Sequence, residues 1–205
     1  MRTHPLRTEP SPQLDRQSES TMLGLTGADH SRGNPDATLT LVEYGDYEDS
    51  ASIQAEPLTQ HLVDTFGTRL RFVYRHNPLM EIHPHAELAA EAAEAAAAQG
   101  QFWAMHHLLC SSSVLHANHL KLPALTGYAQ AIGLDMNRFN GEMADRIYTQ
   151  RVQEHRRAAE HTGIRTMPAF FLNGAMVDVS FGVAHLETAV QAALLRQPGA
   201  SGLRT

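Results

Sequence analysis

Cysteine is scarce in this sequence, since Cys110 is the only one among 205 residues. A single thiol excludes an internal disulfide and any intramolecular dithiol cycle. A transmembrane helix needs about 20 apolar residues in a row, and Glu87, Glu91 and Glu94 interrupt the most apolar segment, residues 86–98. These acids share one helix face, which predicts a solvated acidic stripe. We expect neither a structural disulfide nor a membrane-spanning helix.

Positive charge is also in short supply, with 16 Lys and Arg against 22 Asp and Glu and a net charge of −6. The chain as a whole therefore has no electrostatic attraction to nucleic acid or to an anionic membrane, and we expect neither as a partner. Residues 1–30 are low in large apolar residues and lack the apolar run of a signal peptide. We expect them to form a disordered leader and the protein to be cytoplasmic. The sequence does not indicate an oligomeric state.

The most informative stretch begins with a β-branched and aromatic run, residues 39–44, that stops at Gly45 and is followed by acids. Apolar residues then return at helical spacing from Ile53 to Phe66. This pattern predicts a strand, a tight turn and a helix N-terminus. Such a junction presents free backbone N–H groups and the positive end of the helix dipole, which suits an anion or an activated thiolate.

The elements that follow are predicted from periodicity and from the residues that interrupt it. Residues 30–37 form a turn cluster, and residues 70–75 alternate as a second strand. Strand, helix and strand in this order predict a parallel βαβ unit. Between residues 84 and 162 the pattern is helical with several breaks. The helices expected there cover residues 84–100, 102–109 and 122–132, a short stretch with Met136 and Phe139, and residues 142–161.

The last segment returns to strands. The pair Asn173-Gly174 separates residues 169–172 from residues 175–178. Asn-Gly supplies the two positive φ angles of a type I′ turn, which predicts a β-hairpin. Residues 183–195 then form a closing helix with one apolar face.

Two motifs flank the start of the first predicted helix. Residues 43–48 read E-Y-G-D-Y-E, and residues 55–57 read A-E-P. Together they resemble the DsbA-type branch of the thioredoxin-like superfamily, whose members carry C-P-x-C between these motifs. In this chain that place is taken by four other residues, Asp49, Ser50, Ala51 and Ser52. The flanking motifs of the family are present, and its redox dithiol is absent.

A third motif, residues 163–174, resembles the family's G-x-x-T-P-x-F-F-[IL]-N-G element around its cis-proline. It departs from the family at Met167, directly before Pro168, where threonine or valine is usual. In the family this turn exposes backbone groups to an extended peptide or to glutathione. The resemblance spans about residues 29–195.

The resemblance implies a bacterial protein with a thioredoxin-like α/β fold, made of a βαβ unit and a C-terminal ββα unit with an all-helical insertion between them. We place the thioredoxin-like domain at residues 31–82 and 163–197 and the helical insertion at residues 83–162. Residues 198–205 would form a frayed tail.

Binding, rather than catalysis, is the expected function. Disulfide exchange needs a thiolate that attacks sulfur, and neither a serine hydroxyl nor a carboxylate replaces it. We therefore expect no catalytic residue among positions 49–52, and Asp49 is expected to cap the helix. The favoured hypothesis is a non-redox module that binds an extended peptide or protein partner in the cis-proline groove. Its predicted binding residues are Tyr47, Ser50, Ser52, Met167 and Pro168.

A glutathione-dependent transferase or isomerase is one alternative. Kappa-class glutathione transferases and hydroxychromene-carboxylate isomerases share the architecture and steady the glutathione thiolate with a serine near this helix end. Ser50 or Ser52 would take that role here, and glutathione would be the only cofactor. The neighbouring acids Asp46, Glu48 and Asp49 oppose this hypothesis because they repel a second anion.

A single-thiol oxidoreductase that uses Cys110 is another alternative. It requires an exposed, electropositive setting that lowers the pKa of the thiol. Cys110 ends the apolar face of the helix predicted at residues 102–109, and a lone cysteine is most often a small buried apolar residue. We expect that role for it.

The sequence holds 13 histidines, which invites a metal interpretation. The four closest to one another in sequence lack the i,i+4 pairing with a neighbouring acid that marks a zinc site: His83, His85, His106 and His107. Residues 75–79 and 82–86 resemble the family's R-H-[FY]-P-L and I-H-P-H-A. The resemblance assigns these histidines to packing near the former active site, and we expect no metal ion.

Overall fold

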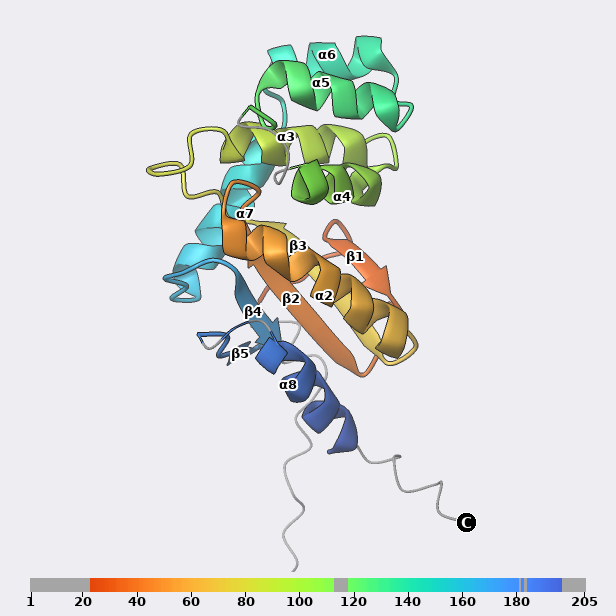
Figure 1. Cartoon of the computed structure of the whole chain (residues 1–205), viewed down its shortest axis with the longest axis vertical. Coiled ribbons are helices and arrows are strands. Elements are labelled where there is room, and N and C mark those ends of the chain that lie inside the picture. The colour runs from red at the N-terminus through yellow and green to blue at the C-terminus, as the bar shows by residue number, and fades with distance from the viewer. Residues whose placement is uncertain (1–22, 113–117, 181, 183, 197–205) are drawn as a thin grey trace, which may run out of the picture.

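The computed structural model describes residues 23–112, 118–180, 182 and 184–196. Its centre is a five-stranded sheet with the strand order β1-β3-β2-β4-β5 (Figure 1). The strands are β1 (His30–Gly33), β2 (Leu39–Gly45), β3 (Leu70–His76), β4 (Ala169–Leu172) and β5 (Ala175–Val177). β2 and β3 are parallel, and the other three pairings are antiparallel.

The described residues form seven helices. They are α2 (Ser50–Phe66), α3 (Ala86–Ala97), α4 (Phe102–Ser112), α5 (Leu122–Ala131), α6 (Met136–Ala144), α7 (Thr149–His161) and α8 (Ala184–Leu195). The segment β2-α2-β3 is the βαβ unit, β4-β5-α8 is the ββα unit, and α3 to α7 lie between them in the chain. The α/β fold with an all-helical insertion that the sequence predicts is confirmed.

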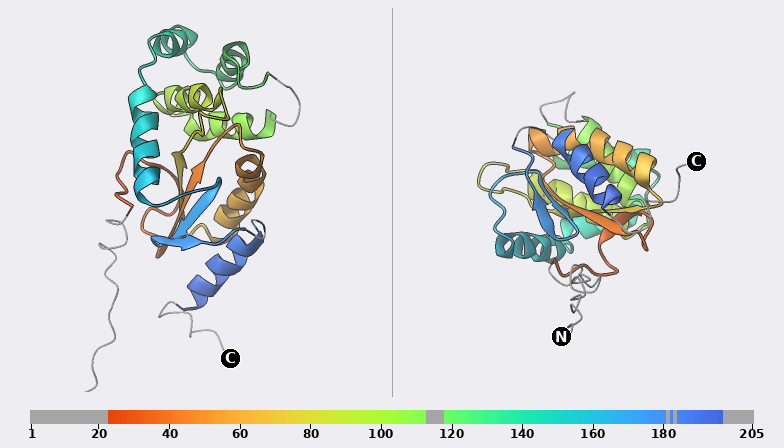
Figure 2. Two further views of the ribbon diagram at one scale, coloured as in Figure 1. Left: turned by 90° about the vertical axis from the view of Figure 1, so that its left-hand side faces the viewer. Right: turned by 90° about the horizontal axis from the view of Figure 1, so that it is seen from below.

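Helices cover both faces of the sheet (Figure 2). Alternate residues of a strand point to opposite faces. Leu41 and Phe72 belong to the large core that also holds residues of α2 and α8, whereas Val42 and Val73 pack with Ala159 of α7. The two central strands are therefore buried on both sides at nearly every position, including polar residues such as Glu43 and Arg75.

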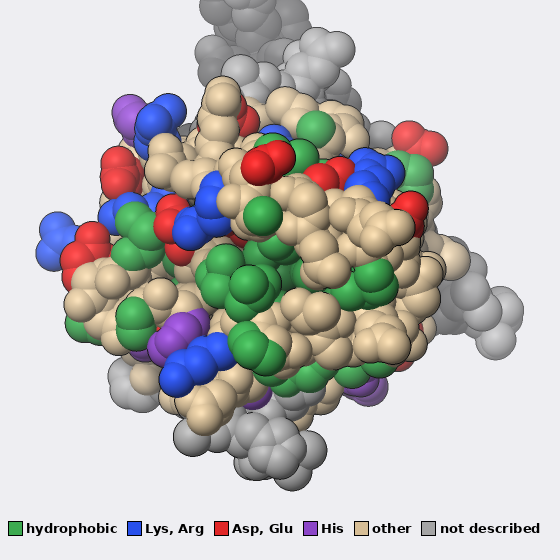
Figure 3. All heavy atoms as spheres, turned by 90° about the horizontal axis from the view of Figure 1, so that it is seen from above, with side chains coloured by type: hydrophobic (Ala, Val, Ile, Leu, Met, Phe, Trp, Pro, Cys, Tyr) green, Lys and Arg blue, Asp and Glu red, His purple; other side chains and the backbone are tan. Residues whose placement is uncertain are grey.

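α3 lies at the centre of the insertion and packs against α4, α5, α6 and α7. Its alanines allow this close surrounding, since Ala89, Ala92 and Ala93 are fully buried. Figure 3 views the molecule from the end that α5 and α6 form, with apolar side chains gathered at the centre of this face. None of the helices in the described part of the chain is long and apolar enough to cross a bilayer.

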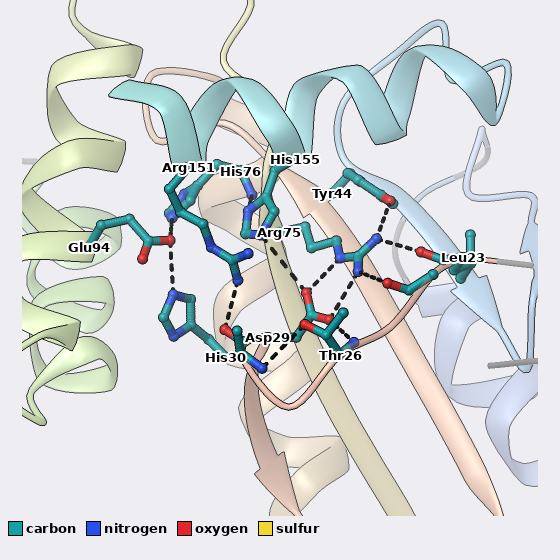
Figure 4. Close-up of polar contacts among 12 residues, drawn as sticks. Leu23, Thr26, Asp29, His30, Tyr44, Arg75, His76, Glu94, Arg151 and His155 are labelled. Atoms are coloured by element: carbon teal, nitrogen blue, oxygen red, sulfur yellow. Dashed lines mark hydrogen bonds and ion pairs between the residues drawn. The ribbon is translucent and has the colours of Figure 1, made fainter. Parts of the chain in front are cut away.

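The start of the described chain differs from the prediction. Residues 1–22 lie outside the described residues, but Leu23 and Asp29 are buried, so the expected disordered leader does not extend to residue 30. Arg75 anchors this segment through hydrogen bonds from Nε to Asp29 Oδ1 at 2.7 Å and from Nη2 to Oδ2 at 2.9 Å (Figure 4). The expected turn cluster at residues 30–37 begins instead with β1, because β3 offers its free edge to residues 30–33.

Two predictions about the insertion are also wrong. The expected acidic stripe is not solvated, because Glu91 and Glu94 are buried. Glu91 accepts hydrogen bonds from Arg146 at 2.6 and 2.7 Å and from Thr149 Oγ1 at 3.0 Å. The helix expected at residues 142–161 is broken, since Arg146 has a φ of 52°, and α7 begins only at Thr149.

The short-range turn prediction is confirmed. Asn173 and Gly174 have φ angles of 47° and 80°, and the hairpin pairs Leu172 with Ala175. Asn173 also accepts a hydrogen bond from Thr40 N at 2.7 Å, which ties the turn to β2.

Removing the carboxylate that faces Arg75 tests the anchoring of the N-terminal segment. Asp29→Ala would leave a buried guanidinium without its counter-ion, which costs about 3–5 kcal/mol of unfolding free energy. Urea unfolding at pH 7 measures this loss. The control is Asp36→Ala, an exposed position, expected within about 0.5 kcal/mol of the parent. Equal stability of the two variants would contradict the anchoring role.

Candidate functional site

Asp49 lies at the junction between β2 and α2, where the family carries its first cysteine. Its backbone is extended, with φ −84° and ψ 122°, and its Oδ2 accepts a hydrogen bond from Ser52 N at 2.7 Å. The predicted N-cap is confirmed. The carboxylate satisfies a free N–H group of the helix and places a negative charge at the positive end of the helix dipole.

Asp46 fixes the turn that precedes the cap. It is 2% exposed, and its Oδ1 accepts a hydrogen bond from Glu48 N at 2.7 Å. Its Oδ2 accepts hydrogen bonds from Leu79 N at 2.8 Å and from His83 Nδ1 at 2.7 Å. One carboxylate thus holds the turn after β2 against the loop after β3.

Glu48 makes the corresponding link to the insertion. Its Oε2 accepts a hydrogen bond from His85 N at 2.7 Å, and its Oε1 lies 3.0 Å from His85 Nδ1. His85 is the N-cap residue of α3, so Glu48 places its charge at the N-terminus of that helix. The resemblance placed His83 and His85 near the former active site, and the contacts with Asp46 and Glu48 agree with that placement.

The two serines of the former C-P-x-C site have different environments. Ser52 is buried, and its Oγ accepts a hydrogen bond from Asp46 N at 3.3 Å. Ser50 is exposed at the first position of α2. Of the four replaced positions, only Ala51 lines the groove described below.

The structure places Tyr47 in the core rather than in the groove. Its hydroxyl and His106 Nδ1 are hydrogen bonded at 2.9 Å, and its ring stacks on that of Tyr74 with centroids 5.5 Å apart. Burial raises the pKa of Tyr47 well above its usual value, and the Cys110 and Glu94 charges add to this. Tyr47 therefore supports the junction from beneath and does not face a ligand in the groove.

A groove of about 820 Å³ lies between the start of α2 and the segment around Pro168. Ala51 and Gln54 form its α2 side, and residues 164–169 and 176–180 form the rest together with Gly182. Most of the lining is apolar, and Arg165 and Asp178 are its charged residues. The structure thus brings Met167 and Pro168 together with the replaced C-P-x-C segment.

The segment before β4 has backbone groups available to a ligand. The Met167–Pro168 peptide bond is cis, and Asn77 Nδ2 lies 3.5 Å from Met167 Sδ. Within the described residues, no hydrogen bond reaches the backbone of Thr166 or Met167. β5, whose Met176 and Val177 line the groove, is the outermost strand on this side of the sheet. This face of the molecule thus combines an apolar surface with backbone groups that make no hydrogen bond within the described residues.

Cys110 is buried, as predicted, and Sγ lies 4.0 Å from His106 Nε2. Burial raises the pKa of its thiol well above the usual value, and the charges of Glu43 and Glu56 raise it further. A thiol in this setting stays protonated and is a poor nucleophile at neutral pH.

Glu43 is a residue for which the sequence predicted no role of its own. It lies on β2, on the same face as Leu41, and is 2% exposed. Burial raises its pKa to about 8, Arg32 opposes this shift, and Glu56 adds to it. The one hint in the sequence was an acid within a mostly apolar strand. The sequence could not show that Glu43 is buried, because its burial depends on the tertiary structure.

The comparisons with known proteins agree with this architecture. A family model described as thioredoxin matches residues 25–192. The chain belongs to the thioredoxin family.

Proteins named Na(+)/H(+) antiporter NhaA resemble the chain in sequence. One from Salinispora arenicola is 42% identical over 165 residues, which cover 80% of this chain and 24% of that protein. One from Mycobacterium sp. is 38% identical over 168 residues, which cover 80% of this chain and 26% of that protein. The chain spans about a quarter of the length of these relatives.

Solved structures resemble the chain in fold. A thioredoxin-like oxidoreductase from Silicibacter pomeroyi has a TM-score of 0.72 and 25% identity, over 87% of this chain and 98% of that one. BdbD from Bacillus subtilis has a TM-score of 0.73 and 16% identity, over 82% and 93% of the two chains. The thiol-disulfide exchange protein alpha-DsbA2 from Wolbachia pipientis has a TM-score of 0.70 and 15% identity, over 87% and 94%. This thioredoxin-family chain thus has the fold of DsbA-type proteins.

The raised pKa of Glu43 predicts a specific pH dependence of stability. Between pH 4.5 and about 8 the folded state keeps the proton that the unfolded state releases. Stability should therefore fall as the pH rises through this window and level off above it. Glu43→Gln keeps the size of the side chain and removes the titration. Its stability should change less across the window and exceed that of the parent at pH 8 by on the order of a few kcal/mol.

Urea unfolding at pH 5, 6.5 and 8 measures this effect. Glu160→Gln, at an exposed position, is the control and should show the pH dependence of the parent. If Glu43→Gln and the parent have the same pH dependence, Glu43 does not titrate in this window.

Proposed function

We propose that this chain is a non-redox binding module that holds an extended segment of a partner protein in the groove beside Pro168. The observation that carries the proposal is the combination of an apolar groove with the unbonded backbone of Met167. A segment with one apolar side chain would bury it between Ala51 and Met176. Its backbone would bond to that of Met167, as in other cases where an extended chain pairs with exposed backbone.

The residues at the former C-P-x-C site support binding rather than catalysis. The carboxylate of Asp49 is engaged with Ser52 N, and Ser52 Oγ is engaged with Asp46 N. Neither group is available as a nucleophile, and neither replaces a sulfur in disulfide exchange. This also weighs against Ser52 as the partner of a glutathione thiolate, which leaves Ser50 as the candidate for that alternative. The cytoplasmic location stays a prediction.

Peptide binding can be tested with a phage-displayed library of linear peptides. The enriched sequences should bind the purified full chain, as measured by fluorescence polarisation. Ala51→Trp fills the groove from an exposed helix position, and Met167→Pro removes the backbone donor. Each should weaken binding at least about tenfold, because each removes one of the two interactions proposed. Met167→Leu keeps the donor and an apolar side chain and should bind like the parent.

Two results would contradict the proposal. One is a screen in which no peptide is enriched over an empty support. The other is an affinity that neither Ala51→Trp nor Met167→Pro changes, while circular dichroism shows that both variants are folded.

The absence of redox activity has its own test. The parent should reduce insulin with dithiothreitol no faster than Cys110→Ala does. The double variant D49C/S52C restores two sulfurs at i and i+3 on the helix N-terminus, where the dipole stabilises a thiolate, and it should gain reductase activity. The non-redox proposal would be overturned if the parent reduced insulin faster than Cys110→Ala does. A folded D49C/S52C variant without reductase activity would show that the scaffold no longer supports the reaction.

A second candidate concerns the partner. A region 42% identical to this chain forms part of a protein named Na(+)/H(+) antiporter NhaA. We therefore propose that this chain binds an antiporter of this kind. The probe is the Salinispora arenicola protein without its matched region, purified in detergent. Binding to this chain that Ala51→Trp weakens would support the candidate, and no binding at micromolar concentration would exclude it.

A further inference from the structure

We propose that His30, His76 and Glu94 form a binding site for a divalent transition-metal ion, with zinc as the best match. His30 comes from β1, His76 from β3 and Glu94 from α3 (Figure 4). His30 Nε2 lies 2.9 Å and His76 Nε2 lies 3.0 Å from Glu94 Oε1. The three atoms all lie within 4.8 Å of one another, so one ion can contact two imidazole nitrogens and a carboxylate oxygen.

The two imidazoles converge on a single carboxylate oxygen. Both meet Oε1 of Glu94, and within the described residues no hydrogen bond reaches its Oε2. One carboxylate oxygen can accept hydrogen bonds from both imidazoles, because it has two lone pairs. The same closeness of two imidazole nitrogens and one carboxylate oxygen is what a shared metal ion requires, since the ion would take the place of the protons between them.

Neighbouring rings hold both imidazoles in place. His30 stacks on Phe102 with centroids 3.6 Å apart, and His76 stacks on His155 with centroids 5.6 Å apart. Backbone atoms fix the second stack, since His76 N donates to His155 Nδ1 at 3.3 Å. The three groups are thus preorganised, which reduces the entropy lost on binding an ion.

The ligand types also suit zinc. Two imidazole nitrogens and one carboxylate oxygen are a ligand set found in zinc centres, which add a fourth ligand to these three.

Two arginines lie near the site. Arg75 is paired with Asp29, and Arg151 Nη2 donates to the backbone oxygen of Ala28 at 2.7 Å. Among the described residues, Glu94 is the carboxylate that contacts the two imidazoles. An ion here would tie β1 and β3 to α3 and so join the sheet to the insertion. None of these ligands lines the groove, so the site is independent of the proposed function.

Spacing in the sequence could not have indicated this site. Glu94 is 64 positions from His30 and 18 from His76, whereas zinc motifs that can be recognised in sequence hold pairs of ligands a few residues apart. The spacing argument against a metal ion concerned His83, His85, His106 and His107, none of which contributes here. The resemblance also assigned the histidine of residues 75–79 to packing, and His76 is nevertheless a ligand of the proposed site.

Cobalt and zinc titrations of the full chain test the site. The protein, purified without a polyhistidine tag and treated with chelator, is titrated with Co²⁺ while visible absorption is followed, and Zn²⁺ is then added in competition. We expect one equivalent of each ion to bind. Glu94→Gln keeps the acceptor oxygen but removes the charge, and His30→Gln removes one ligand. Because each change alters a direct ligand, affinity should fall by more than the 10–100-fold that loss of an outer-shell partner causes.

His61→Gln is the matched control, because it removes an exposed histidine of α2 and should leave the affinity unchanged. If Glu94→Gln does not fold, His30→Gln at its half-buried position decides the question, with circular dichroism as the check of folding. The proposal is overturned if neither ion binds at micromolar concentration or if folded variants bind like the parent. It is equally overturned if binding is lost in His83→Gln or His85→Gln instead.

Discussion

The buried carboxylate of Asp46 is the interaction on which the functional end of the molecule depends. It accepts hydrogen bonds from Glu48 N, Leu79 N and His83 Nδ1, which come from the two loops that follow β2 and β3. Burying a carboxylate without such partners would cost much free energy. Without the carboxylate, each of its three donors would in turn lose its acceptor. The geometry at the start of α2 therefore rests on charged hydrogen bonds.

The helix end that carries a reactive cysteine in related proteins is occupied by Asp49 in this chain. In a thiol-disulfide oxidoreductase the helix N-terminus stabilises a reactive thiolate. Here Asp49 already uses that end of the helix, since its carboxylate accepts a hydrogen bond from Ser52 N. The helix end is satisfied within the chain and has little left to offer a second anion. The neighbouring groove does not depend on sulfur, because it offers an apolar lining and, within the described residues, a backbone at Met167 without hydrogen bonds.

Acidic side chains also attach the insertion to the rest of the fold, and two of them, Glu91 and Glu94, are buried. Glu48 caps α3 from the junction, Glu94 meets histidines from β1 and β3, and Glu91 holds Arg146 at the break before α7. Removing one partner of a buried charged pair is strongly destabilising because it strands the other. Such contacts favour a single position of the helices on the sheet, which keeps the groove and the histidine cluster in fixed places.

Sequence alone determined those features that depend on residues close together in the chain. A few neighbouring side chains predict the run of β2, the alternation of β3, the cap at Asp49 and the Asn173-Gly174 turn. The resemblance of three motifs supplied the fold. Tertiary structure alone decided the burial of Tyr47, Ser52 and Glu94 and the pairing of β1 with β3. The physical reason is distance along the chain. Tyr47 contacts His106, which is 59 residues away, and Glu94 contacts His30, which is 64 residues away. A local sequence pattern therefore cannot show whether a polar side chain will be buried.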